Sequence, residues 1–590
     1  MKKIEIYLIT ALLVFANSSC SKFLDKEVDL SLSDEQVFRS FENTRGFLAN
    51  IYTYLPDAFL GYTDGQYLAA SRDCMTSNSL SYWNVHRYHS VVNDSYSAVD
   101  HWFAASYWPR NFRAIRAANQ FMKNARPTVI GNSDKTGDDY RLYDRNIAEA
   151  RLLRAIFHFD LACWFGDVAI VGDDENGTPI IFDPSDINGM NRERTKCADA
   201  LKWIADECDA IKDKLPFRYS NETENWGRVN GATAYALKSR ALLYRASPLH
   251  NPGNDVSYWQ DAAKAATDFI TKNNSLGGPY KLFTVGDKNR NYYECFVATP
   301  YYNDEYILTR SVWNSRAIEE FLAPVGFKGT LNAVGRTNPT QNLVDCYETI
   351  KGLPIDLDTD YDEQNPYAGR DPRLAQTILY HGSIWGDRVQ EEERAIDVSY
   401  PDGKDYQELH GGTLTGYYTK KFLNNISFKV PTNSEHACPI FRYGEILLNA
   451  AEAVNEAYGP ADAYQYVNQV RGRVEMPGYN GMTKEQLRER IRNERRIELC
   501  FEDHWFFDER RWKLFESQTM TGERNLPRYK QVYNIYGVTV TPEAETVYTY
   551  RPAQMHPTRA FNAPKNYFFP IPDAEVKKAP KLKQNQGWEL

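Results

Sequence analysis

The chain has 590 residues, of which 42% are hydrophobic and 25% are charged, and it carries a formal net charge of −9. These values are ordinary for a globular protein, and they exclude an extensively disordered chain and a membrane protein with many spans. The negative charge also argues against a protein that depends on attraction to the phosphates of nucleic acids. Aromatic residues are in excess at 14% of the chain, and 40 of them are tyrosines.

The first residues have the pattern of a lipoprotein signal peptide. Lys2 and Lys3 precede an apolar run over residues 6–16, and small residues lead to Cys20. The run is too short to span a membrane comfortably, so we interpret residues 1–19 as a cleaved signal peptide. We expect Cys20 to become the mature N-terminus and to be acylated, which would hold the protein on a membrane. The alternative is an ordinary secretory signal that leaves Cys20 unmodified.

Several stretches have apolar residues at helical spacing, interrupted by clear stop signals such as Gly166 and Pro248. Asn230 is placed to cap the helix that ends before Pro248. We read these stretches as helix pairs. The predicted helices cover residues 35–55, 108–125, 145–164, a stretch that includes Ala198 and Ile211, residues 232–247, 258–272 and 442–473.

Long insertions separate the helices. Residues 56–107 and 274–436 are loop-like, aromatic and rich in turn residues, and residues 517–566 are irregular with a short hairpin predicted in VYNIYGVTVTP. No low-complexity linker divides the chain, so we expect one compact body. Loops on a rigid scaffold are where binding residues usually lie.

The most informative segment runs from Phe441 to Trp512. Ile446, Ala450 and Ala453 share one helix face, Gly459-Pro460 breaks the helix, and the apolar spacing then resumes. Alanines on the contact face allow two helices to pack closely. The segment therefore predicts an antiparallel helix pair of the kind found in tetratricopeptide arrays.

Four motifs in this order resemble those of the SusD/RagB family of outer-membrane nutrient-binding lipoproteins of Bacteroidetes. The short segment SKFLDKE after Cys20 also resembles the start of the mature proteins of this family. The four motifs are EARLLRAIFHFDLACWFGDVAIV at 149–171, FRYGEILLNAAEAVNEA at 441–457, NERRIELCFEDHWFFDERRW at 493–512 and YFFPIPDAEVKKAPKLKQNQGW at 567–588.

The resemblance implies a mostly α, SusD-like fold: a degenerate tetratricopeptide-type helix-pair scaffold with long irregular loop insertions and a few short strands. We expect a single body over residues 20–590, with an N-terminal SusD-like region to about 330 and a C-terminal RagB/SusD region from about 331. It further implies a lipid-anchored protein on the outer-membrane surface. Such a protein captures an oligosaccharide or polysaccharide and passes it to a SusC-like TonB-dependent transporter.

A catalytic site is the alternative that has to be weighed. Glu494 and Glu498 share a helix face, and two carboxylates are the minimum equipment of a glycosidase. Four arginines surround them in sequence, however, which favours a structural ion-pair network. We therefore expect no enzyme activity. The four arginines are Arg495, Arg496, Arg510 and Arg511.

The sequence gives little support for a metal or a cofactor. His86 and His89 have no acidic third ligand at a fixed spacing, and the acidic run at 356–363 lacks the glycine and the terminal glutamate of a calcium loop. No nucleotide or nucleophile motif is present, and we expect no cofactor. Eight cysteines beyond Cys20 form no metal-ligand spacing, and we expect Cys163, Cys208 and Cys500 to be buried as small hydrophobes.

A sugar-binding surface combines flat aromatic faces with planar hydrogen-bonding groups. Two loops offer this combination, at residues 67–102 and 292–313. The resemblance places ligand contacts in approximately these two regions, although neither belongs to the family motifs. The predicted ligand-binding residues are Arg72, Asp73, Tyr82, Trp83, Asn84, Tyr301, Asn303 and Trp313. Aromatic loops would also suit peptides, so a peptide-binding uptake protein stays open as an alternative, with a surface glycoside hydrolase behind it.

Overall fold

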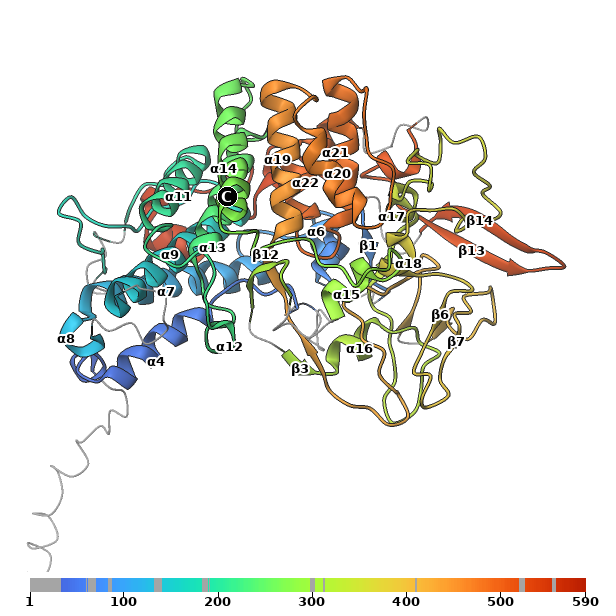
Figure 1. Ribbon diagram of the computed structural model, residues 1–590, viewed down its shortest axis with the longest axis horizontal. Helices are drawn as coiled ribbons and strands as arrows, with labels where there is room; N and C mark the ends of the chain where they lie inside the picture. Colours follow the sequence, from blue (N-terminus) through green and yellow to red (C-terminus); the bar gives the residue numbers. More distant parts are fainter. Residues whose placement is uncertain are drawn as a thin grey trace, which may run out of the picture.

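The computed structural model describes residues 33–59, 61, 70–82, 87–131, 141–182, 189, 191–297, 303–310, 313–408, 411–518, 526–553 and 559–589. In Figure 1, long helices stand together on one side of the protein, while loops and short strands, drawn mainly in yellow and ochre, form the other side. Within these ranges, no helix combines the length and the apolar character needed to cross a bilayer.

The larger part of the protein is a series of helices that we call the helical array. Consecutive helices pack side by side from α7 to α14, α14 then packs on α19, and both α20 and α21 pack on α19. The prediction of helix pairs in a mostly α protein is confirmed. The array consists of α7 (Trp102–Asn124), α9 (Leu142–Phe165), α11 (Cys197–Ile211), α13 (Gly231–Ala246), α14 (Val256–Ser275), α19 (Tyr443–Tyr458), α20 (Tyr464–Gly472) and α21 (Lys484–Glu498).

Local signals in the sequence set the ends of these helices. The Asn230 side chain accepts a hydrogen bond from the Thr233 amide at 2.9 Å, and the Thr233 hydroxyl accepts one from the Asn230 amide at 3.3 Å, which confirms the predicted cap. Gly166 ends α9 with φ of 74°, and Gly459 ends α19 with φ of 95°. Residues with a side chain rarely adopt these angles, so glycine is the residue that allows the stop.

Two helix predictions need correction. The single helix expected over residues 35–55 is two helices, because Ser40 caps a new helix start after the first turn has ended at Phe38. The helix expected from Trp108 begins six residues earlier, at Trp102, where the His101 side chain accepts a hydrogen bond from the Ala104 amide at 3.2 Å. Pro109 lies inside this helix and does not start it.

Shorter helices connect and flank the array. They are α3 (Asp34–Val37), α4 (Phe41–Tyr52), η1 (Arg72–Met75), α6 (Tyr88–Val92), α8 (Pro127–Ile130), α12 (Glu222–Asn225), α15 (Asn291–Val297), α16 (Ala317–Leu322), α17 (Gln341–Cys346), α18 (Arg373–Thr377), α22 (Trp505–Arg511), η3 (Leu514–Ser517), η4 (Arg528–Lys530), η5 (Lys565–Tyr567), α23 (Asp573–Lys578) and η6 (Pro580–Leu582).

Strands are short and join in antiparallel pairs throughout the described part of the chain. The longest pair, β13 with β14, is the hairpin predicted from the alternation in VYNIYGVTVTP. The pairs are β1 (Ser79–Leu80) with β4 (Asn338–Pro339), β2 (Tyr306–Thr309) with β12 (Pro439–Arg442), β3 (Trp313–Ser315) with β11 (Ser434–His436), β5 (Ile378–Leu379) with β10 (Tyr418–Thr419), β6 (Ile384–Trp385) with β7 (Arg394–Ala395), β8 (Gln407–Glu408) with β9 (Gly411–Gly412), and β13 (Tyr536–Pro542) with β14 (Thr546–Pro552).

The described part of the protein has two large hydrophobic cores, one among the long helices and one among the loops and short strands. One fills the helical array, with Leu153, Ala236 and Leu447 fully buried in it. The other lies under what we call the loop-built region, namely the described residues between 291 and 438 together with β13 and β14. Its members come from short elements and loops that are far apart in sequence. The long insertion predicted as loop therefore has a core of its own.

All eight cysteines of the described chain are free thiols. Cys208 and Cys500 are buried among apolar side chains as predicted, whereas Cys163 is only partly buried at the surface of its core. Burial raises the pKa of these thiols above the ordinary value, so they stay protonated at neutral pH.

Candidate functional site

Arg72, one of the predicted ligand contacts, is buried in η1 and is 7% exposed. Its guanidinium forms an ion pair with Asp503 and also donates to the Tyr107 hydroxyl and, at 3.1 Å, to the backbone carbonyl of Asp57. These partners are all groups of the protein itself. The surroundings of Arg72 therefore favour a structural role over the predicted contact with a ligand.

Asp73 and Asn303 are likewise buried, each 1% exposed. The Asp73 carboxylate accepts hydrogen bonds from the Phe501 amide at 2.8 Å and from Asn78 Nδ2 at 3.2 Å. Burial raises the pKa of Asp73 to about 7. Asn303 shapes the turn into β2, since its amide donates to the Cys295 carbonyl at 2.7 Å. The predicted role of both residues in ligand binding gains no support from these contacts.

The other predicted residues are placed as follows. Trp83, Asn84 and Tyr301 lie outside the described residues, as does the predicted lipidation site at Cys20. The backbone of Trp313 begins β3 and pairs with His436 of β11. Of the predicted residues, Tyr82 is the one whose described side chain reaches a surface of the kind expected.

Tyr82 belongs to a surface cluster that we call the tyrosine patch, formed by Tyr82, Tyr400, Tyr406, Gln407 and Arg551. The Gln407 amide donates to the Tyr82 hydroxyl at 2.9 Å. The rings of Tyr400 and Tyr406 lie edge to face with centroids 5.6 Å apart. Tyr400 is 50% exposed, Gln407 is exposed, and Tyr82, Tyr406 and Arg551 are half-buried. Aromatic surface and planar polar groups are thus brought together and left accessible.

The β13–β14 hairpin supports this patch. Val538 and Val540 are 2% and 1% exposed and point into the core, so the alternate positions of the hairpin face away from it. Arg551, opposite Gly537, lies on that outer face and donates to the Thr539 hydroxyl at 2.6 Å. The Tyr400 amide donates to the Val540 carbonyl at 2.7 Å, which fixes the loop with Tyr400 along the hairpin edge.

The remaining members of the patch are also held by backbone pairing. Gln407 lies in β8 opposite Gly412 of β9, and Tyr82 lies two residues after the end of β1. Burial raises the pKa of the Tyr406 hydroxyl, while the nearby charge of Arg551 lowers it. The phenol is therefore neutral at physiological pH and can both donate and accept a hydrogen bond.

Sequence reasoning did not identify Tyr400, Tyr406, Gln407 or Arg551. A usable signal existed for the first three, because residues 400–407 read YPDGKDYQ, a Pro-Asp-Gly turn flanked by tyrosines. Arg551 had none, since its position depends on the register of the hairpin. The patch joins chain segments more than 300 residues apart, as from Tyr82 to Tyr406.

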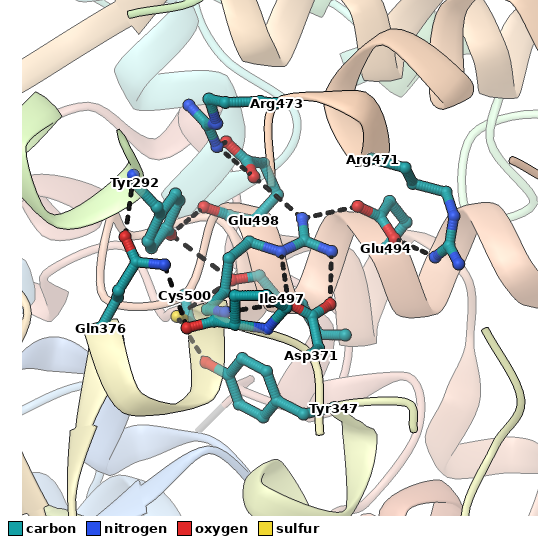
Figure 2. A network of polar contacts seen from close by, with 12 residues as sticks. Tyr292, Tyr347, Asp371, Gln376, Arg471, Arg473, Glu494, Ile497, Glu498 and Cys500 are labelled. Carbon is teal, nitrogen blue, oxygen red and sulfur yellow. Dashed lines mark hydrogen bonds and ion pairs between the residues drawn. The ribbon is translucent and has the colours of Figure 1, made fainter. Parts of the chain in front are cut away.

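Glu494 and Glu498, the carboxylate pair weighed as a catalytic site, are both fully buried. Figure 2 shows them beside the side chains of Arg471 and Arg473. Arg373 Nη1 lies 2.5 Å from Glu494 Oε1 and 3.0 Å from Glu498 Oε2. Arg471 pairs with Glu494 at 3.0 Å, and Arg473 pairs with Glu498 at 2.5 Å. The predicted structural ion-pair network is confirmed. Its arginines, however, come from α18, from the end of α20 with the residue that follows it, and from β12, and they are not those adjacent in sequence.

The electrostatics of this network keep Glu498 ionised. Burial alone would raise the pKa of Glu498, but the charges of Arg473, Arg442 and Arg373 hold it well below its usual range. Arg442 also pairs with Glu305 at 2.6 Å, so the network ties α21 and β12 to the loop-built region. Nor do the described residues contain a group of three acidic, histidine or cysteine side chains that could hold a metal ion.

Comparison with known proteins agrees with this architecture. A model of the SusD family matches residues 285–588, and a second model, described as starch-binding associating with outer membrane, matches residues 22–243. Two proteins of Formosa agariphila, both named SusD-like, are 22% and 21% identical over 508 and 534 residues. These alignments cover 84% and 87% of this chain and 82% and 90% of the relatives.

Solved structures of similar fold include two from Bacteroides fragilis. A SusD-like protein superposes with a TM-score of 0.73 at 22% identity and covers 94% of this chain and 98% of its own. A SusD-like carbohydrate-binding protein gives a TM-score of 0.67 at 23% identity, with 93% and 100% covered. The predicted SusD-like fold is thus confirmed. Because the first family model alone spans more than half of the sequence, the chain belongs to the SusD family.

Proposed function

We propose that this protein is a cell-surface lipoprotein that binds an oligosaccharide or polysaccharide and passes it to a SusC-like TonB-dependent transporter of the outer membrane. The tyrosine patch carries the proposal. Its exposed and half-buried tyrosine rings suit the C–H surfaces of sugars, and the Gln407 amide and the Arg551 guanidinium suit their hydroxyls. One structural neighbour is described as carbohydrate-binding, which supports the same ligand class.

Capture without cleavage follows from the groups that the patch contains. None of its five side chains is a carboxylate, and the Tyr406 hydroxyl is a neutral donor and acceptor. The carboxylate pair at Glu494 and Glu498 is fully buried and occupied by arginines, which keeps it from a glycosidic bond. The patch therefore holds a sugar and lacks the acid and base for its hydrolysis.

The location and the partner rest on the sequence resemblance. Acylation of Cys20 would anchor the protein, and the family model that matches residues 22–243 is described as associating with the outer membrane. We assign the ligand to the loop-built region and the contact with the transporter to the helical array. Trp83 and Asn84, which follow Tyr82 in the sequence, stay proposed ligand contacts.

The test is isothermal titration calorimetry of the protein against a panel of glycans, with peptides included and with product formation followed by chromatography. We expect saturable binding of a glycan without products. Tyr406→Ala should lower the affinity about tenfold, or about 1.4 kcal/mol, since it removes a ring face. The matched control is Tyr458→Ala, which removes a tyrosine that is 60% exposed at the end of α19.

Other results would change the proposal in different ways. Equal losses of glycan affinity in Tyr406→Ala and Tyr458→Ala would show that the tyrosine patch is not the glycan site. Binding of peptides alone would leave an uptake protein with a different nutrient. Turnover of a glycan would contradict capture without cleavage. Copurification of the full chain with a large barrel protein from the outer membrane tests the proposed partner. Failure to copurify would contradict the proposal that this protein works with a transporter.

A further inference from the structure

A cleft lies beside α7 of the helical array and differs in chemistry from the tyrosine patch. This cleft has a volume of about 500 Å³ and is bounded by α7, by the segment that follows α9 and by α23 with η6. Its walls are mainly apolar. They include Trp108, Phe112, Val171, Ile180, Phe182 and Leu582.

The walls of the cleft would not suit a sugar. A sugar placed there would lose the water around its hydroxyls and find few polar partners, which costs free energy for each unpaired group. An aliphatic chain would instead exchange water for apolar contacts, at roughly 25 cal/mol for each Å² buried. A cleft of this size and composition is typical of a site for a small apolar ligand.

The charges at the rim are mostly positive. Arg113, Arg116 and Arg192 border the cleft, and none of the three forms an ion pair with a carboxylate in the described part of the chain. Arg116 donates to the Phe182 carbonyl, and the Arg192 guanidinium lies 4.8 Å from the centre of the Phe182 ring. Both arginines are thereby directed to the same wall.

The other two charged residues of the cleft compensate each other. Lys578 pairs with Glu575 at 3.0 Å, which leaves the three arginines as the excess charge. Such an excess stands out in a chain with a formal net charge of −9. Guanidinium groups without a carboxylate partner, at the mouth of an apolar cleft, complement an anionic group attached to an apolar chain.

We propose that this cleft binds a single-chain anionic amphiphile, with the aliphatic chain along Phe112 and Phe182 and the carboxylate or phosphate at Arg113, Arg116 and Arg192. The inference is independent of glycan binding at the tyrosine patch, because the two sites share no residue. The cleft would thus bind a class of ligand different from the glycan proposed for the tyrosine patch.

Three probes with the same chain and different head groups test the proposal. Dodecanoate, dodecan-1-ol and dodecylamine compete with a dansyl-labelled fatty acid for the purified full chain in detergent-free buffer. We expect dodecanoate to bind about tenfold more tightly than the alcohol and more tightly still than the amine, because charge-assisted hydrogen bonds to arginine stabilise the anion. Equal affinity for the three head groups, or no displacement by any, would overturn the proposal.

Variants of the arginines at the rim test whether the anionic group binds at this cleft. Arg113→Gln and Arg116→Gln should each weaken dodecanoate about fivefold and leave the alcohol unchanged, since they remove charge and keep the apolar walls. Arg388→Gln removes an exposed arginine from the β6–β7 loop and is the matched control. Loss of dodecanoate binding in this control as large as in the rim variants would place the anion elsewhere. Glycan titrations of the same variants distinguish the two sites, because we expect the glycan affinity of these variants to equal that of the wild type.

Discussion

The helical array and the loop-built region bury their apolar residues in different ways. In the array, each helix presents a stripe of small and aliphatic side chains to its neighbour, and contacts within and between successive helices form the core. In the described residues from 303 to 433, the loop-built region has no helix longer than six residues and instead collects side chains from short helices, short strands and turns. Specific polar contacts, such as those of Arg373 and Glu305, help to fix its chain path.

The buried ion pairs show what this difference means. Arg373 of α18 reaches Glu494 and Glu498 of α21, and Arg442 connects Glu305 to the same helix. Loops without regular hydrogen bonding need such partners to satisfy their polar groups. Regular helices satisfy their own. We infer that the loop-built region depends more strongly on its buried charges than the array does, since the Arg154–Glu207 and Arg240–Glu445 pairs of the array only supplement the packing between long helices.

The largest expected effect tests this dependence. Glu498→Ala leaves Arg373, Arg442 and Arg473 buried without their shared carboxylate, and it should lower the free energy of unfolding by about 5 kcal/mol. Urea unfolding followed by circular dichroism measures the change. Glu489→Ala, an exposed residue of the same helix, should change stability by less than about 0.5 kcal/mol. Similar small changes in both variants would contradict the dependence on charged residues.

Leu447→Ala tests how the core of the helical array responds to a loss of side-chain volume. Leu447 is fully buried in α19, and its truncation should cost about 3 kcal/mol through lost burial and the cavity left behind. Leu447→Met should restore most of that loss, because the cavity is filled again. The comparison would break if Leu447→Met were as unstable as Leu447→Ala, since the array would then depend on exact shape.

A third effect depends on pH. Burial raises the pKa of Asp73 to about 7, above the unfolded value of 3.8, so between these two values the folded protein binds a proton that the unfolded chain has lost. Stability from this group is complete below the unfolded pKa and is lost as the pH rises through about 7. Asp73→Asn cannot titrate, so wild type should lose about 2.5 kcal/mol relative to this variant between pH 5 and pH 8. Parallel urea curves at both pH values measure it, and a constant difference would refute the raised pKa.

The smallest expected effect concerns the surface of the loop-built region. Tyr82→Phe removes the hydroxyl that accepts the Gln407 hydrogen bond and leaves the ring. We expect glycan affinity to fall by about 1 kcal/mol and stability to change by less than that. Calorimetry and urea unfolding of one preparation separate the two quantities. A large loss of stability would show that the tyrosine patch is part of the core.

The sequence predicted what depends on near neighbours. The cap at Asn230 could be recognised because its partner Thr233 is three residues away, and the helix stops at Gly166 and Gly459 are single-residue signals. The structural nature of the Glu494 and Glu498 pair was predicted correctly, although from neighbouring arginines that are not its partners. Local prediction fails at Ser40, where a helix cap inside a helical pattern divides the expected single helix into two.

Contacts between distant segments could not be predicted from the sequence. Arg373, one of the true partners of Glu498, lies 125 residues away, and Tyr82 meets Gln407 across 325 residues. Arg72, Asp73 and Asn303 had the residue types of a sugar-binding loop, yet the fold uses these side chains to satisfy internal polar groups. Composition identifies residues suited to binding, and only the packing of the chain decides which of them remain exposed.

The buried thiols give the protein a built-in reporter of its own opening. Cys197 and Cys208 lie in the core of the helical array, whereas Cys295, Cys346 and Cys500 lie in that of the loop-built region. Burial raises the pKa of all five, so an alkylating reagent reaches them as thiolates only after the surrounding structure has opened. Pulsed alkylation followed by mass spectrometry can therefore time the exposure of each region separately in the natural sequence.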